Sequence, residues 1–255
     1  MTHRIDCLQY ANWSEKIFRQ MREGGVDAVH VTIAYHENFR ETVLNIERWN
    51  RWFEQFPELI FHGRTGDDVR LARETDRTAI FFGFQNPSPI EDDIGLVEIV
   101  HQLGVRFMQL TYNNQSLLAT GCYEEEDIGL TRMGRAVVAE MNRVGLVIDM
   151  SHSAERSTLE AIDHSTRPIA ITHANPGQEG VRGVCCDCRR RAGRRRPGAP
   201  PAGAGGRAAR RRRGRSAARD RLWRGAGIEF APGRDAVRAR GLASALLQLR
   251  RCARS

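Results

Sequence analysis

Five short apolar runs divide the first two-thirds of the chain. They are rich in Val, Ile or Phe, have the length of buried strands, and cover Ala28–Ala34, Thr78–Phe84, Val105–Thr111, Leu146–Met150 and Pro168–Thr172. Each run is continuously apolar rather than alternating, which is typical of parallel strands that are covered on both faces. The pattern therefore predicts a parallel sheet.

Amphipathic segments with helical periodicity fill the intervals between the runs. The predicted helices cover Ser14–Arg22, Glu37–Phe56, Ile90–Leu103, the stretch from Thr131 to a stop at Gly145, and Ser153–His164, with Ser153 as the N-cap of the last one. Alternating strands and helices indicate a βα-repeat protein, either an open doubly wound sheet or part of an eight-stranded barrel. No Gly-rich phosphate loop follows the first predicted strand, which argues against dinucleotide binding.

The composition changes abruptly near Gly177. Residues 1–177 carry 17 Lys+Arg against 26 Asp+Glu, whereas residues 178–255 carry 22 Arg, no Lys and 5 acidic residues. The net charge of +8 therefore describes neither part. We predict two regions: residues 1–177 as a partial barrel of about five βα units, and residues 178–255 as a disordered tail rich in Arg, Ala, Gly and Pro.

Two hypotheses account for the basic tail. The first is a shift of reading frame in a GC-rich coding sequence, because Arg, Ala, Gly and Pro are the residues that such codons give when they are read out of frame. The second is a genuine basic segment that binds nucleic acid or another anionic surface by electrostatic attraction. We favour the first, because the Arg runs lack the aromatic residues on which bases stack.

The remaining bulk features predict a cytoplasmic protein. The segment Met1–Trp13 is polar and lacks the apolar core of a secretory signal, and no stretch approaches the roughly 18 apolar residues of a membrane span. The spacing of the six cysteines does not suggest a disulfide framework. We expect reduced thiols and no association with a membrane, and the sequence leaves the choice between monomer and homo-oligomer open.

His152 and His173 carry the strongest chemical signal. Each follows an apolar run, and the interval between them holds one predicted helix, so their strands should be parallel neighbours. The carboxyl ends of the strands form the active-site face of βα proteins, and neutral imidazole is a good zinc ligand. The alternative is that each histidine only hydrogen-bonds at a strand end, but two at one level favour a metal site. Asp149 is a weaker candidate, for orienting one of these ligands.

Several motifs in a fixed order resemble the membrane (renal) dipeptidases, peptidase family M19. They are Leu110–Asn114, Gly121–Glu124, Asp127–Thr131, Met141–Gly145, Ile148–His152 and Pro168–His173, and the resemblance covers about residues 5–176. It implies a (β/α)8 TIM-barrel-like metallo-hydrolase with two bridged zinc ions that cleaves dipeptides with a metal-activated hydroxide. It also implies that His152 and His173 bind the second zinc.

The chain departs from the family pattern at the first zinc. The family has Asp-Gly-His-x-Asp at its first strand, where this chain keeps only Asp6 and has Leu8 and Tyr10 in place of the two ligands. Gln85 stands where the family has a bridging Glu, and a neutral amide offsets little of the repulsion between two dications. Tyr112 stands where some members of the family carry a substrate-polarising histidine; it could donate a hydrogen bond to a carbonyl or an oxyanion, and the alternative is that it packs under a loop.

Three hypotheses for function follow. The first is a zinc-dependent dipeptidase-like hydrolase acting on dipeptides or similar small peptides, with His152 and His173 as metal ligands and Tyr112 as a catalytic residue. The second is a catalytically impaired relative that keeps the barrel but lacks the first metal site. The third is a binder of nucleic acid or anionic surfaces through the tail, which requires that the tail be genuine.

Overall fold

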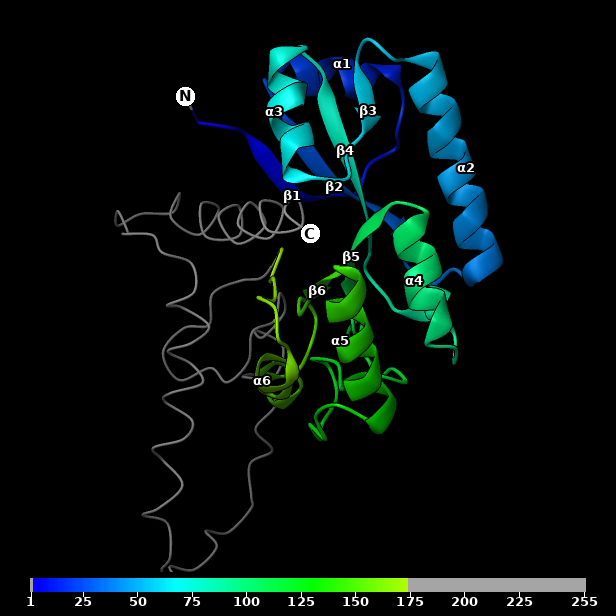
Figure 1. Ribbon diagram of the computed structural model, residues 1–255, viewed down its shortest axis with the longest axis vertical. Helices are drawn as coiled ribbons and strands as arrows, with labels where there is room; N and C mark the ends of the chain where they lie inside the picture. The colour runs from blue at the N-terminus through cyan, green and yellow to red at the C-terminus, as the bar shows by residue number, and fades with distance from the viewer. Residues whose placement is uncertain (1, 174–255) are drawn as a thin grey trace, which may run out of the picture.

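The computed structural model describes residues 2–173, which form one curved sheet of six parallel strands with helices packed along it (Figure 1). The strands are β1 (Ile5–Gln9), β2 (Ala28–Ala34), β3 (Ile60–His62), β4 (Thr78–Phe84), β5 (Val105–Gln109) and β6 (Val147–Asp149). The α-helices are α1 (Glu15–Glu23), α2 (Phe39–Gln55), α3 (Gly66–Glu74), α4 (Gly95–Gln102), α5 (Arg132–Val144) and α6 (Glu155–His164), and a 3-10 helix covers Ser88–Ile90.

The strands pair in the order β1-β2-β4-β5-β6, and every pairing is parallel. The short strand β3 pairs with the first half of β4, where Ile60 faces Thr78, while β5 pairs with its second half, where Phe84 faces Met108. This is a half-barrel of alternating strands and helices, so the predicted truncated TIM-barrel-like fold is confirmed. The predicted tail at residues 178–255 lies outside the described residues.

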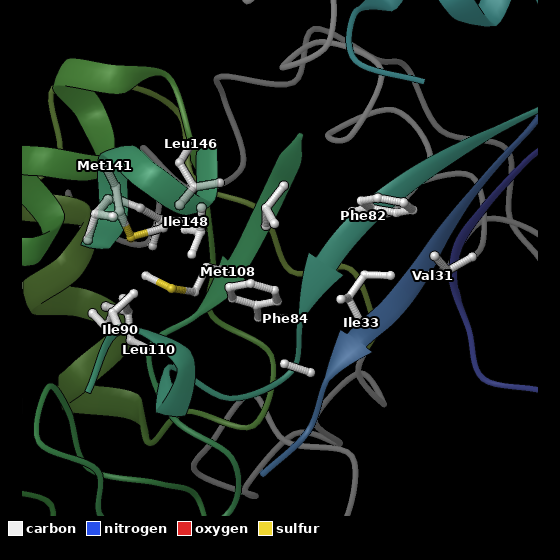
Figure 2. Packing of buried hydrophobic residues seen from close by; sticks show 14 of the residues in the cluster. Val31, Ile33, Phe82, Phe84, Ile90, Met108, Leu110, Met141, Leu146 and Ile148 are labelled. Atoms are coloured by element: carbon white, nitrogen blue, oxygen red, sulfur yellow. The ribbon is translucent and has the colours of Figure 1, made fainter. Parts of the chain in front are cut away.

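The two faces of the sheet bury two separate apolar clusters. Val31, Ile33, Phe82 and Phe84 belong to the cluster that also contains apolar side chains of α1, α2, α4, α5 and α6. Figure 2 shows part of this cluster, including Met141 of α5. The opposite face carries a smaller cluster, to which α3 adds Val69 and Ala72; its sheet members are Cys7, Ala28, Ala79, Phe81, Phe107, Val147 and Ala170. Burial on both faces explains why the strands read as continuous apolar runs.

Predicted and observed elements agree closely for most of the chain. β2 and β4 have the predicted bounds, and helix α5 ends where Gly145 adopts a left-handed backbone with φ 88°. The predicted Pro168–Thr172 strand is reduced to a single parallel bridge between Asp149 and Ala170. The prediction that Ser153 caps the last helix is wrong, because α6 has Ala154 at its N-cap and begins at Glu155.

No helix within residues 2–173 is both long enough and apolar enough to cross a membrane.

Candidate metal centre

The structure brings His152 and His173 together at the carboxyl edge of the sheet. His152 follows β6, and His173 follows the segment that continues the sheet through the bridge at Ala170. Their Nε2 atoms are 2.8 Å apart, and the ring centroids are 4.8 Å apart. Strand order and the position of each histidine after its strand were sufficient to predict this juxtaposition.

The His152 ring contacts the side chain of Asn113 in the loop after β5. Nδ1 of His152 lies 2.7 Å from Oδ1 of Asn113. An amide oxygen can only accept a hydrogen bond, so Nδ1 carries the proton and donates it. Nε2 of His152 is then left with its lone pair, which it directs toward His173.

The His173 ring is held by a chain of two hydrogen bonds. Nδ1 of His173 lies 2.8 Å from Oγ1 of Thr172, and that hydroxyl lies 2.6 Å from Oδ2 of Asp149. The carboxylate accepts, so Thr172 donates to Asp149 and accepts the proton of Nδ1. His173 therefore also presents the lone pair of Nε2.

Two facing lone pairs are a chemical fit for a cation. At 2.8 Å the two nitrogens would repel each other unless a proton or a metal ion lies between them. A tetrahedral zinc with Zn–N distances of about 2.0–2.1 Å holds two nitrogens about 3.3 Å apart, so a separation of the rings by about half an ångström would admit the ion. The histidine pair therefore fits the second metal position that the family resemblance implies.

The first metal position does not have a matching set of ligands. Gln85 is buried, and its Nε2 donates to Oγ1 of Thr32 at 2.8 Å. Asp6 is exposed and accepts from the backbone N–H of Leu8 at 3.2 Å, while Tyr10 is 77% exposed. In the part of the chain that is described, no group of three or more His, Cys, Asp or Glu residues is placed to hold a metal.

Asp149 is the fixed negative charge behind the histidine pair. Its side chain is fully buried and accepts hydrogen bonds from both N–H and O–H of Ser151 and of Thr172. Burial acts to raise the pKa of Asp149, but the nearby His173 and these hydrogen bonds outweigh it and lower the pKa. Burial also lowers the pKa of His173, partly offset by Asp149, which favours the neutral imidazole that a metal requires.

Tyr112 lies directly beside the pair. Its ring centroid is 4.3 Å from that of His152, and its hydroxyl is hydrogen-bonded to the hydroxyl of Tyr35, which follows β2. The structure thus groups Tyr112, His152, His173 and Asp149, while the side chains of Gln85 and Asp6 make the separate contacts given above.

Asn113 and Thr172 are site residues that the sequence analysis missed. Thr172 immediately precedes His173, and Asn113 lies in the Thr-Tyr-Asn-Asn segment, 39 positions before His152. A polar residue next to a ligand was a usable signal for Thr172. No spacing rule pointed from Asn113 to His152, because the loop between β5 and α5 is long and irregular.

A parallel βα half-barrel with paired imidazoles at the carboxyl edge of its strands has the architecture of barrel enzymes, whose active sites lie at that edge. The family model for membrane dipeptidase (peptidase family M19) matches residues 7–184, and the chain belongs to this family of metallodipeptidase-type hydrolases.

Curated relatives carry the same label. The chain is 29% identical to "Dipeptidase tcpJ" of Claviceps purpurea over 151 residues and 29% identical to "Dipeptidase aclJ" of Aspergillus oryzae over 145 residues. These matches cover 58% and 55% of this chain but only 34% of either relative. The chain therefore spans about a third of the length of these relatives.

Solved structures share the fold. An amidohydrolase from Pseudomonas aeruginosa is 42% identical, with a TM-score of 0.65 over 66% of this chain and 52% of that one. A metallo peptidase from Rhodobacter sphaeroides, liganded with a phosphinate mimic of the dipeptide L-Ala-D-Ala, is 17% identical, with a TM-score of 0.58 over 68% of this chain and 65% of that one. At 17% identity, the likeness to the Rhodobacter sphaeroides protein shows the fold alone.

Proposed function

We propose that this chain acts as a dipeptidase-type hydrolase with a single zinc ion held between His152 and His173. The observation that carries the proposal is the 2.8 Å approach of the two Nε2 atoms, with both Nδ1 atoms committed as hydrogen-bond donors. Family membership supports small peptides as substrates.

Each residue near the pair has a distinct task in this proposal. His152 and His173 hold the ion, which when bound would lower the pKa of a water so that it can attack the peptide carbonyl. Tyr112 accepts the O–H of Tyr35 and donates its own O–H to the carbonyl oxygen as negative charge develops there. Asp149 acts through Thr172 to keep the proton of His173 on Nδ1.

A second candidate is a family member that binds peptides without cleaving them. It is favoured by the neutral residues at the first metal position, where Gln85 is hydrogen-bonded to Thr32 and Tyr10 faces solvent. One ion offers less charge than two for stabilising an oxyanion. The two candidates differ in turnover, not in zinc binding.

The full-length chain, stripped of metal with a chelator and then titrated with zinc by calorimetry, tests the proposal. We expect one zinc per chain, metal-dependent release of alanine from Ala-Ala, and loss of both in His152→Ala and His173→Ala. His164→Ala is the matched control, because His164 is an exposed histidine at the end of α6. Zinc binding without turnover would select the second candidate, and no zinc binding would refute both.

A further inference from the structure

The link between Asn113 and His152 has features that the proposed function does not require. Both residues have a left-handed backbone although neither is glycine, with φ 61° for Asn113 and φ 64° for His152. Left-handed backbone is costly for most residues and is tolerated where surrounding contacts hold it in place. Asn113 and His152 are also joined through their side chains, with Oδ1 of Asn113 2.7 Å from Nδ1 of His152.

Backbone hydrogen bonds clamp the loops that carry these two residues. The N–H of Cys122 donates to the carbonyl of His152 at 2.9 Å, and the N–H of Tyr123 donates to the carbonyl of Asn113 at 2.8 Å. Gly121 pairs with Ser153 in an antiparallel bridge. The loop after β5 is thus fastened to the loop after β6 by main-chain contacts.

Gly121 allows this clamp to close. A Cβ at position 121 would lie 2.1 Å from the carbonyl oxygen of Asn113, which is closer than any side-chain carbon can approach. The Asn113 backbone therefore rests directly on the Gly121 backbone. The position of Asn113 is fixed without any contribution from its own side chain.

We infer that Asn113 is a positioning residue for His152: its amide oxygen selects the Nδ1-protonated form and the ring orientation that directs Nε2 to the metal. The inference rests on the proposed metal site. Because main-chain contacts already hold the loop, the side-chain bond is left with one evident task, at the imidazole. The Sγ of Cys122, 3.7 Å from Oδ1 of Asn113, is a further donor toward the same oxygen and is consistent with its acceptor role.

Two substitutions separate the side chain from the backbone. Asn113→Gly accepts a left-handed backbone but removes the oxygen, whereas Asn113→Asp tolerates that backbone and keeps an acceptor. Asn114→Gly is the matched control, because Asn114 is the exposed neighbour in the same loop. All three are made in the full chain and compared with the wild type.

Two measurements are made on each variant. The first is the ¹⁵N spectrum of the metal-free protein with labelled histidine, in which the His152 signals are assigned by their loss in His152→Ala. The second is the zinc dissociation constant by calorimetry. We expect Asn113→Gly to shift His152 toward the Nε2-protonated form and to weaken zinc binding by about 10–100-fold, and Asn113→Asp to retain both properties within about threefold.

Several results would overturn the inference. A wild-type His152 that lacks a proton on Nδ1 and carries its proton on Nε2 alone would do so without any variant, which covers the case in which Asn113→Gly fails to fold. Equal zinc affinity in Asn113→Gly and in wild type, or equal losses in the Gly and Asp variants, would also do so. If the wild type binds no zinc, the proposed function fails, while the histidine spectra still decide whether Asn113 positions the ring.

Discussion

The imidazole of His30 fills the space beside Gly83 on the neighbouring strand, with its Nε2 edge turned toward the glycine. A Cβ at position 83 would lie 1.8 Å from Nε2 of His30. The ring stacks on Phe107 with centroids 4.6 Å apart, and its Nδ1 is 2.7 Å from the carbonyl oxygen of Cys7. One histidine of β2 thus contacts residues of β1, β4 and β5, and the missing side chain at Gly83 makes room for it.

The first prediction is that Gly83→Ala lowers the free energy of unfolding by about 2–4 kcal/mol. The added methyl must displace the His30 ring, which costs packing against Phe107 and the hydrogen bond to Cys7. Urea unfolding of the full chain measures the change. Gly95→Ala is the control, because a Cβ there meets only the exposed side chain of Asp93, at 3.1 Å. Equal stability of the two variants would contradict the packing described here.

The second prediction concerns acid. Burial lowers the pKa of His30 to about 4, from 6.5, against a smaller opposing effect of Asp149. At pH values between 4 and 6.5, His30 therefore binds a proton in the unfolded chain but not in the folded one. Stability is lost as the pH falls from 6.5 toward 4. Burial also lowers the pKa of His62 and His101 to about 4, which adds losses in the same direction.

His30→Gln isolates the contribution of His30. From about pH 7 to about pH 4.5, the free energy of unfolding should fall by about 2–3 kcal/mol less in this variant than in the wild type. This difference does not depend on how stable the variant is at neutral pH. Urea unfolding at the two pH values gives the difference. His164→Gln, which removes an exposed histidine, is measured alongside for comparison. A His30→Gln slope equal to that of the wild type would show that His30 does not resist protonation.

Most of the fold could be predicted from the sequence, because buried parallel strands leave a strong signal. β2 and β4 are seven-residue apolar runs, and the structure has them where the sequence placed them. Strand β3 and helix α3 were missed, and β1 is not among the five predicted runs. β3 has only three residues, and α3 buries only a small apolar face, Val69 and Ala72, against the sheet. Short elements whose pairing is decided by a distant neighbour carry little local pattern.

The candidate site was predictable in part for the same reason. The convergence of His152 and His173 follows from strand order, and that order was readable. The hydrogen bonds that fix the two rings could not be predicted from the sequence. They depend on the path of the loop after β5 and on left-handed backbone at Asn113 and His152. Ser153 illustrates the opposite error: its residue type suggested a helix cap, but the helix begins one position later and its hydroxyl is buried.

The third prediction concerns the charge behind the histidine pair. Asp149→Asn replaces one carboxylate oxygen with an N–H₂ group that faces hydrogen-bond donors of Ser151 and Thr172. We expect a loss of about 2–4 kcal/mol in the free energy of unfolding, measured with urea in the absence of metal. Asp92→Asn, at an exposed bend, should change stability little. A stable Asp149→Asn would show that the four hydrogen bonds do not depend on the negative charge.

The fourth prediction is that the first metal position can be restored. Zinc requires charged or imidazole ligands there, and Leu8, Tyr10 and Gln85 supply none, so the wild type should bind one ion. The variant Leu8→His, Tyr10→Asp, Gln85→Glu introduces the ligand types that the family resemblance implies at these positions. Gln85 is buried, so a carboxylate in its place should destabilise the metal-free protein. A bound ion should offset this loss of stability.

Elemental analysis and thermal unfolding with and without zinc test this restoration. We expect the zinc content to rise from one to two ions per chain, and zinc to raise the melting temperature of the triple variant more than that of the wild type. Leu8→Asn, Tyr10→Asn with Gln85 unchanged is the control, because it adds polar groups without charge. If the triple variant still holds one ion, the ends of β1 and β4 do not place these side chains within reach of a common ion, and the loss of the first site lies in the backbone as well as in the residues.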